Sequence, residues 1–140
     1  MELNIKILEF VLSKLGLPFL HIGRNDNGYD CAGLYLQALK SIGKFESDMD
    51  LRVYGRSPEG NKIAKIFNKY FDRVEYKDLI DGDAMLFKFL DNPQHIAVYQ
   101  NSDGVDYMVH AYGDPSVNKV VRHVIDEKWQ KRFVMGYRIK

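Results

Sequence analysis

Three apolar stretches decide the fold: AMLFKF at residues 84–89, HIAVY at residues 95–99 and DYMVHA at residues 106–111. In the first of them, every second residue is apolar, which predicts a strand with Met85, Phe87 and Phe89 on one face. The second and third stretches flank the turn signal Ser102-Asp103-Gly104, so they predict a β-hairpin. Two further strands are expected at residues 117–124 and 133–139, with Trp129 in the bend between them.

The residues before these strands show helical spacing instead. Apolar residues recur at steps of three and four within residues 3–15, which predicts a short amphipathic helix. A second helix is expected from Cys31, with Asp30 as its N-cap and Gly43 just after its end. A third is expected to begin at Pro58 and Glu59. Residues 20–30 are expected to form a shaped loop. Helices followed by an antiparallel sheet indicate an α+β fold.

Composition describes one ordinary domain covering residues 1–140. The chain has 140 residues, with 20 Lys and Arg against 19 Asp and Glu and a formal charge of +1. This balance gives no reason to expect a nucleic-acid or membrane partner, since both need concentrated positive charge. No metal site is expected, because no His/Cys group has zinc-ligand spacing, and no cofactor is expected. We also expect no signal peptide, because charged residues interrupt the N-terminal stretch, and therefore synthesis in the cytoplasm.

The lone cysteine, Cys31, is the first candidate for chemistry. It stands in the first turn of a predicted helix, where the helix dipole and backbone N–H groups stabilise a thiolate. We therefore expect a lowered thiol pKa and fast alkylation near pH 6. The alternative is that Cys31 is a small buried apolar residue.

Two histidines fall where they could serve that thiol. His95 begins one strand of the predicted hairpin and His110 lies near the end of the other, so pairing would bring them together. A thiol nucleophile needs an imidazole as base and a third group to orient it. His21 and His123 are interpreted as structural, although His21 lies in the loop leading to Cys31 and is kept as a candidate for substrate binding.

Four ordered motifs resemble the NlpC-type cell-wall cysteine peptidases. They are Asp30-Cys31-Ala32-Gly33-Leu34, Asp81-Gly82-Asp83-Ala84-Met85-Leu86-Phe87, His95-Ile96-Ala97-Val98-Tyr99 and Val109-His110-Ala111. The resemblance covers nearly the whole chain and implies a compact papain-like fold. It also implies that Cys31 is the nucleophile, His95 the general base and His110 the residue that orients His95. The implied reaction is hydrolysis of an amide in a peptidoglycan stem peptide, typically between D-glutamate and a diamino acid, through a thioester.

Other segments resemble the phage-tail-associated branch of that family. They are Pro18-Phe19, His21, Gly23-Arg24, Tyr54-Gly55-Arg56 with Pro58, residues 129–133 and Tyr137-Arg138. This resemblance implies a component of a phage tail or a phage-like particle, with other tail proteins as partners.

Two departures from the family concern the substrate. Members that require a free L-alanine amine resemble one another in a Tyr upstream of the cysteine, an Asp before it and a Ser after it. This chain has Phe19, Asp30 and Ala32 at those places. Phe19 and Ala32 lack the hydroxyl groups of the Tyr and Ser that they replace. We therefore expect this protein to discriminate poorly between stem peptides with a free L-alanine amine and those still linked to glycan. Asp30 serves equally well as a helix cap.

Two other functions are compatible with the same residues. The chain could be a tail assembly or binding module that keeps an enzyme fold for its surface. It could also be a papain-like acyltransferase, in which an amine or a lipid replaces water. Intact Cys31, His95 and His110 favour chemistry over assembly alone, and a hydrophobic anchor for lipid transfer is not found in the sequence.

Overall fold

The computed structural model describes residues 2–46, 49, 62–89 and 92–140. Its helices are α1 (Glu2–Ser13), α2 (Cys31–Ser41), α3 (Lys62–Tyr70) and α4 (Glu127–Arg132), with a 3-10 turn η3 (Tyr76–Asp78). Its strands are β1 (Arg24–Asn25), β2 (Gly28–Tyr29), β3 (Phe71–Val74), β4 (Ala84–Phe89), β5 (Asn92–Ser102), β6 (Val105–Tyr112), β7 (Lys119–Val124) and β8 (Phe133–Ile139).

The main sheet has six antiparallel strands in the order β3-β8-β4-β5-β6-β7. The predicted hairpin is confirmed as β5 and β6, which pair from Ser102 with Val105 to Val98 with Val109. Its turn residues Asp103 and Gly104 have φ of 52° and 81°, the left-handed pair that a two-residue hairpin turn requires. The α+β class is therefore confirmed.

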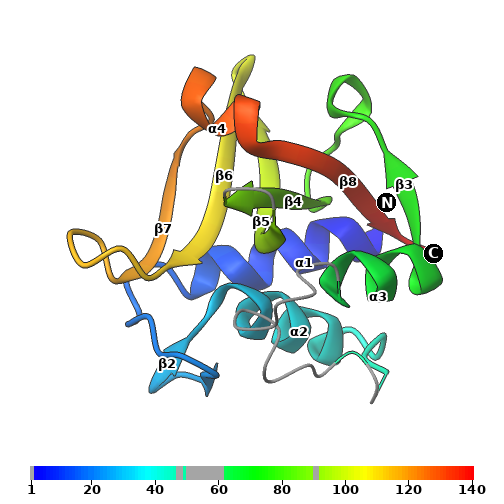
Figure 1. The fold of residues 1–140 in the computed structure, drawn as a ribbon. Coiled ribbons are helices and arrows are strands. Elements are labelled where there is room, and N and C mark those ends of the chain that lie inside the picture. The colour runs from blue at the N-terminus through cyan, green and yellow to red at the C-terminus, as the bar shows by residue number, and fades with distance from the viewer. Residues whose placement is uncertain (1, 47–48, 50–61, 90–91) are drawn as a thin grey trace.

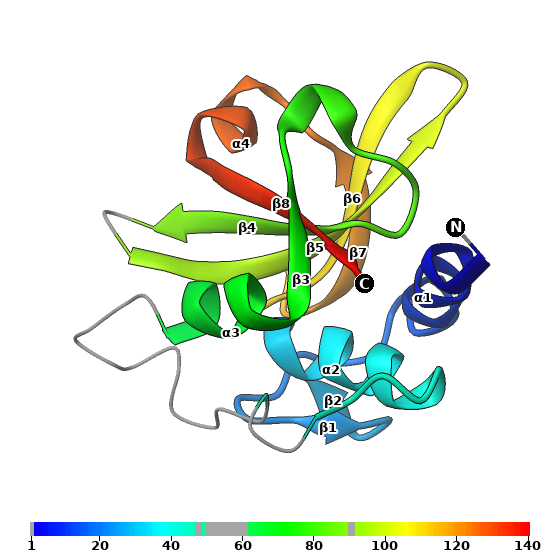
Figure 2. The same ribbon diagram turned by 90° about the vertical axis from the view of Figure 1, so that its right-hand side faces the viewer.

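The sheet is buried on both faces. Ala84 and Leu86 of β4 belong to the main core, which packs against α1, α2 and α3, whereas Met85 and Phe87 belong to a second core that includes Trp129 of α4. Figures 1 and 2 show α4 across the sheet from α2 and α3. The alternation predicted for residues 84–89 is confirmed, and burial on both faces explains why Ala84 and Leu86 are apolar as well, whereas Lys88 is exposed.

The ends of α2 follow the sequence prediction. Asp30 caps the N-terminus, and Gly43, at φ 75°, follows the last turn, where the Lys44 N–H donates to the Leu39 carbonyl. The predicted start of the third helix at Pro58 and Glu59 lies outside the described residues, as does the segment 54–58 used in the resemblance. Strands β1, β2 and β3 were not predicted, because the first two have only two residues each and no turn signal separates β3 from α3.

A buried carboxylate joins the ends of the chain to the sheet. Asp83, fully buried directly before β4, accepts hydrogen bonds from Asn4 of α1, from the Ile80 backbone N–H and from two nitrogens of Arg138 in β8. Asp83 thus accepts from one backbone donor and from two side chains. This network fixes α1 and β8 against the strand that leads toward the histidines.

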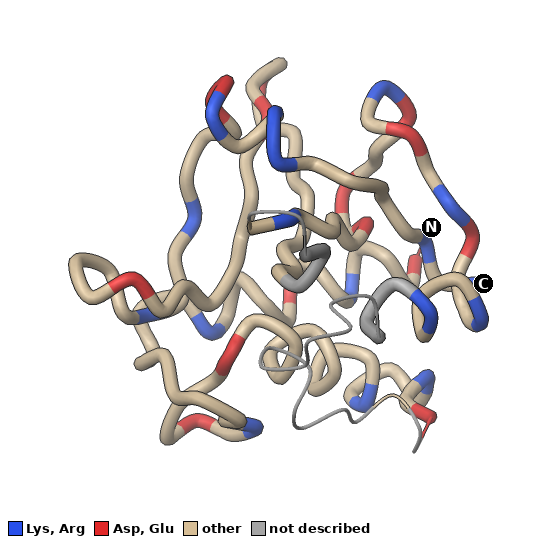
Figure 3. The backbone as a smooth tube through the Cα atoms, in the orientation of Figure 1, with Lys and Arg blue, Asp and Glu red and all other residues tan. Residues whose placement is uncertain are grey.

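The surface carries both signs of charge. Lys and Arg are interspersed with Asp and Glu along the described chain (Figure 3). No helix among the described residues is long and apolar enough to cross a membrane.

Candidate active site

Cys31 is the first residue of α2, as the sequence predicts. Asp30 lies in extended backbone at the cap, and its carboxylate accepts a hydrogen bond of 2.7 Å from the backbone N–H of Gly33. Cys31 itself remains partly exposed. The thiol therefore lies at the N-terminal end of the helix, in a residue that still reaches the surface in part.

The loop before Cys31 closes tightly over this helix end. Arg24 donates to the Asp30 carboxylate at 2.9 Å, and the backbone N–H of Ile22 donates to its other oxygen at 3.0 Å. A Cβ at Gly33 would collide with the carbonyl oxygen of Gly23, so only glycine lets the loop approach this closely. The glycine two residues after the cysteine is thus explained by packing.

The sulfur of Cys31 is held against strand β5. The backbone N–H groups of Ile96 and Ala32 hydrogen-bond to it, and Ile96 directly follows His95 in the chain. Burial raises the pKa of the Cys31 thiol to about 12, and the charge of Asp30 adds to the increase, while the two backbone donors and Arg24 oppose it. The expected lowering of the thiol pKa is therefore wrong for the resting site. The loss of hydration on burial raises this pKa more than the groups at the helix N-terminus lower it.

His95 and His110 are brought together as predicted. The Nε2 atom of His95 lies 2.6 Å from Nδ1 of His110, and the two residues are 5% and 1% exposed. Rings of Phe87, Phe89, Tyr112 and Trp129 surround His95. Burial lowers the pKa of His95 to about 3, and repulsion from Arg132 and from the protonated form of His123 adds to the decrease. Burial likewise holds the pKa of His110 well below its usual value. Both rings are neutral at pH 7.

His123 extends this pair, which the sequence interpretation missed. Its Nε2 lies 2.8 Å from Nε2 of His110, and its Nδ1 lies 3.0 Å from the backbone carbonyl of Val124. In the register of β6 and β7, His110 pairs with Val121, so His123 is its diagonal neighbour on the same face. Only that register, which sequence alone leaves open by a few residues, could have revealed the contact.

Within the described residues, no group of three His, Cys, Asp or Glu side chains is arranged to hold a metal ion.

Of the four candidate substrate-binding residues, two are buried and two reach the surface. Ala32 is 3% exposed and packs in the main core, so its methyl group is not presented to a substrate, contrary to expectation. Asp30 is also 3% exposed, and its oxygens accept the internal donors described above. By contrast, His21 is exposed in the loop, and Phe19 is half-buried beside Gly113.

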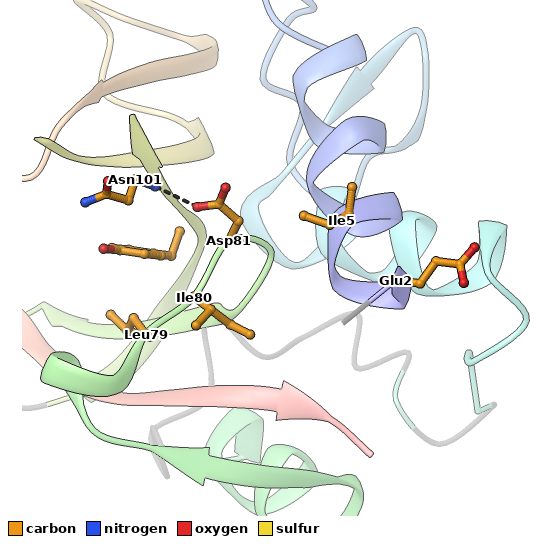
Figure 4. Close-up of a pocket in the computed structure, with 7 residues that line it drawn as sticks. Glu2, Ile5, Leu79, Ile80, Asp81 and Asn101 are labelled. Carbon is orange, nitrogen blue, oxygen red and sulfur yellow. Dashed lines mark hydrogen bonds between the residues drawn. The ribbon is translucent and has the colours of Figure 1, made fainter. Parts of the chain in front are cut away.

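A separate hollow of about 540 Å³ lies beside α1. It is lined by Glu2, Ile5, Leu79, Ile80, Asp81, Tyr99 and Asn101 (Figure 4). The Asp81 carboxylate accepts a hydrogen bond from the Asn101 backbone N–H at its rim. None of the candidate catalytic residues lines this hollow, so it is not part of the site around Cys31.

A cysteine at a helix N-terminus, held against a strand that carries one of two bonded imidazoles, is the arrangement of a cysteine peptidase. Residues 16–138 match the NlpC/P60 family, and the chain belongs to that family. Its peptidoglycan hydrolases are cysteine peptidases, so membership supports a cell-wall amidohydrolase activity.

Solved structures of this family share the fold. The NlpC/p60 domain of the peptidoglycan hydrolase SagA superposes with a TM-score of 0.66 at 13% identity, covering 97% of this chain and 98% of that one. The peptidoglycan hydrolase RipB from Mycobacterium tuberculosis gives 0.70 at 18% identity, covering 99% and 66%. An NlpC/P60 family protein from Bacillus cereus gives 0.71 at 21% identity, covering 97% and 40%. No curated protein matches the chain.

Proposed function

We propose that this protein hydrolyses an amide bond in peptidoglycan stem peptides by covalent catalysis at Cys31. The observation that carries the proposal is the 2.6 Å contact between His95 Nε2 and His110 Nδ1. The residue after His95 in β5 is Ile96, whose backbone N–H hydrogen-bonds to the sulfur of Cys31. Family membership supplies the class of substrate. His95 is the general base in this proposal, and His110 is the residue that orients it.

The proposed reaction begins from a neutral thiol and a neutral imidazole. Nδ1 of His95 takes the thiol proton as the sulfur attacks the carbonyl carbon, because the raised pKa of Cys31 and the lowered pKa of His95 disfavour a resting ion pair. The backbone N–H of Cys31 at the helix start stabilises the oxyanion. The C–N bond then breaks, the leaving amine takes the proton from His95, and a thioester remains. Water deprotonated by His95 hydrolyses the thioester and restores the thiol.

The proposal includes weak dependence on a free L-alanine amine. Asp30 is paired with Arg24 and caps α2, so its carboxylate is already neutralised and held by internal donors. Phe19 has no hydroxyl group to hold an ammonium group, and Ala32 is buried. We therefore expect peptides still linked to glycan to be substrates.

The proposed setting is a phage tail or phage-like particle, assembled with other tail proteins after synthesis in the cytoplasm. Its support is the sequence resemblance of Pro18-Phe19, Gly23-Arg24 and the C-terminal segment to the tail-associated branch.

To test the proposed activity, the purified protein is incubated with defined stem peptides and muropeptides, and the products are identified by mass spectrometry. Hydrolysis of one amide, lost in Cys31→Ala, is the expected result. Matched peptides with a free or a capped L-alanine amine test the selectivity, and rates within about tenfold of each other are expected. Absence of turnover on every wall peptide would overturn the proposal, and a large preference for the free amine, abolished by Asp30→Asn, would overturn its selectivity.

A further inference from the structure

Three imidazoles form a line from the buried site toward the edge of the sheet. His95 Nε2 meets His110 Nδ1 at 2.6 Å, His110 Nε2 meets His123 Nε2 at 2.8 Å, and His123 Nδ1 meets the Val124 carbonyl oxygen at 3.0 Å. The strands β5, β6 and β7 that carry them are consecutive, and β7 is the edge strand. His123 is only half-buried, whereas the other two are enclosed.

The hydrogen bond between His123 Nδ1 and the Val124 carbonyl can have only one donor. A backbone carbonyl only accepts hydrogen bonds, so Nδ1 of His123 must carry a hydrogen. When His123 is neutral, this is its single N–H, so Nε2 of His123 is then an acceptor and Nε2 of His110 is the donor. By the same rule, Nδ1 of His110 accepts and Nε2 of His95 donates. Nδ1 of His95 then has no hydrogen and carries the lone pair that a general base needs.

A neutral histidine is an ambiguous orienting group unless something fixes its own tautomer. With Nδ1 protonated, His110 would force Nε2 of His95 to accept, which would place the His95 hydrogen on Nδ1 and abolish its basicity there. Burial keeps both rings neutral, so charge does not resolve the ambiguity. Through His123, the Val124 carbonyl resolves it.

We propose that His123 is a positioning residue that fixes the tautomers of His110 and His95, so that Nδ1 of His95 is ready to take the thiol proton. The proposal rests on the proposed role of His95 as the base. His123 touches neither the thiol nor a substrate in this account, and it acts through His110. It therefore adds a fourth residue to the set Cys31, His95 and His110.

The primary test is the tautomer of each ring, read by imidazole ¹⁵N NMR near pH 7.5 without substrate. The wild type should show His95 and His110 with hydrogen on Nε2 and His123 with hydrogen on Nδ1. His123→Ala should convert His95 and His110 to a mixture of tautomers. His123→Gln, whose amide oxygen can accept from His110, should restore single tautomers. Arg122→Ala, on the opposite face of β7, is the control and should change no tautomer.

Kinetics on a cleaved stem peptide give the second readout. His123→Ala should lower kcat about tenfold or more with little change in KM, and His123→Gln should recover most of the loss. Hydrogen on Nε2 of His123 in the wild type would overturn the proposal. So would single, unchanged tautomers in a folded His123→Ala protein. The NMR test needs no substrate, so it gives an answer even if the protein hydrolyses no stem peptide. Failure of the tautomer proposal can therefore be told apart from failure of the proposed hydrolase activity.

Discussion

Replacing Arg138 by methionine should destabilise the protein strongly, because it leaves the Asp83 carboxylate buried without its cationic partner. Arg138 donates to Asp83 from Nε at 2.9 Å and from Nη2 at 2.8 Å. Asn4 at 2.7 Å and the Ile80 N–H at 2.9 Å supply the remaining donors. The Asp83 side chain is 0% exposed and that of Arg138 is 32% exposed. Water therefore reaches the arginine but not the carboxylate.

The magnitude follows from this asymmetry. Removal of one partner of a buried pair costs about 3–5 kcal/mol. Two neutral donors stay on Asp83 and Arg138 is one-third exposed, so we expect the lower end, a loss of about 3 kcal/mol in the free energy of unfolding. Asp83→Asn in the same background should recover part of the loss, since the uncompensated charge is then gone.

Urea unfolding at pH 7 of the wild type, both single variants and the double variant gives the coupling energy. Lys131→Met is the matched control, because its pair with Glu127 is exposed on both sides and should contribute at most about 0.5 kcal/mol. A loss below about 1 kcal/mol for Arg138→Met, or no recovery in the double variant, would refute the reasoning from burial.

Three further predictions concern protonation and burial. Iodoacetamide should alkylate Cys31 slowly at pH 6 and faster toward pH 10, because burial raises the thiol pKa to about 12, and a rate plateau near pH 6 would contradict this. The free energy of unfolding should fall as pH drops from about 6.5 toward 3, since unfolded histidine binds a proton there and folded His95 does not. The slope should reach about 1.4 kcal/mol per pH unit for each such histidine, and urea titrations showing a flat profile would refute it. Tyr35→Phe should keep or raise stability by about 1 kcal/mol, because within the described residues the buried Tyr35 hydroxyl has no hydrogen-bond partner, and a thermal melt showing clear destabilisation would contradict this.

Local signals in the sequence were sufficient for the elements that position the thiol. The Asp30 cap, the helix start at Cys31 and the Asp103-Gly104 turn each depend on residues within a few positions of one another. The hairpin predicted from the turn brings His95 and His110 together, and the structure supplies the exact register. These are the parts of the site that short-range physical chemistry determines.

The rest depends on contacts between distant segments. The raised pKa of Cys31 comes from burial against β5, which the helix-end argument does not include. The role of His123 depends on the register of β6 with β7. Ala32 follows the nucleophile in sequence, yet its direction on α2 places it in the core. Each of these outcomes needed the tertiary packing.

The central claim is covalent catalysis by Cys31, and trapping of the thioester tests it most directly. A stem peptide that the protein cleaves is mixed with stoichiometric enzyme, quenched in acid within the first turnover and measured by intact mass. We expect an added mass equal to the acyl fragment, located on Cys31 by peptide mapping, released by hydroxylamine and absent in Cys31→Ala. Cleavage without any adduct on Cys31, at an undiminished rate in Cys31→Ala, would contradict the account.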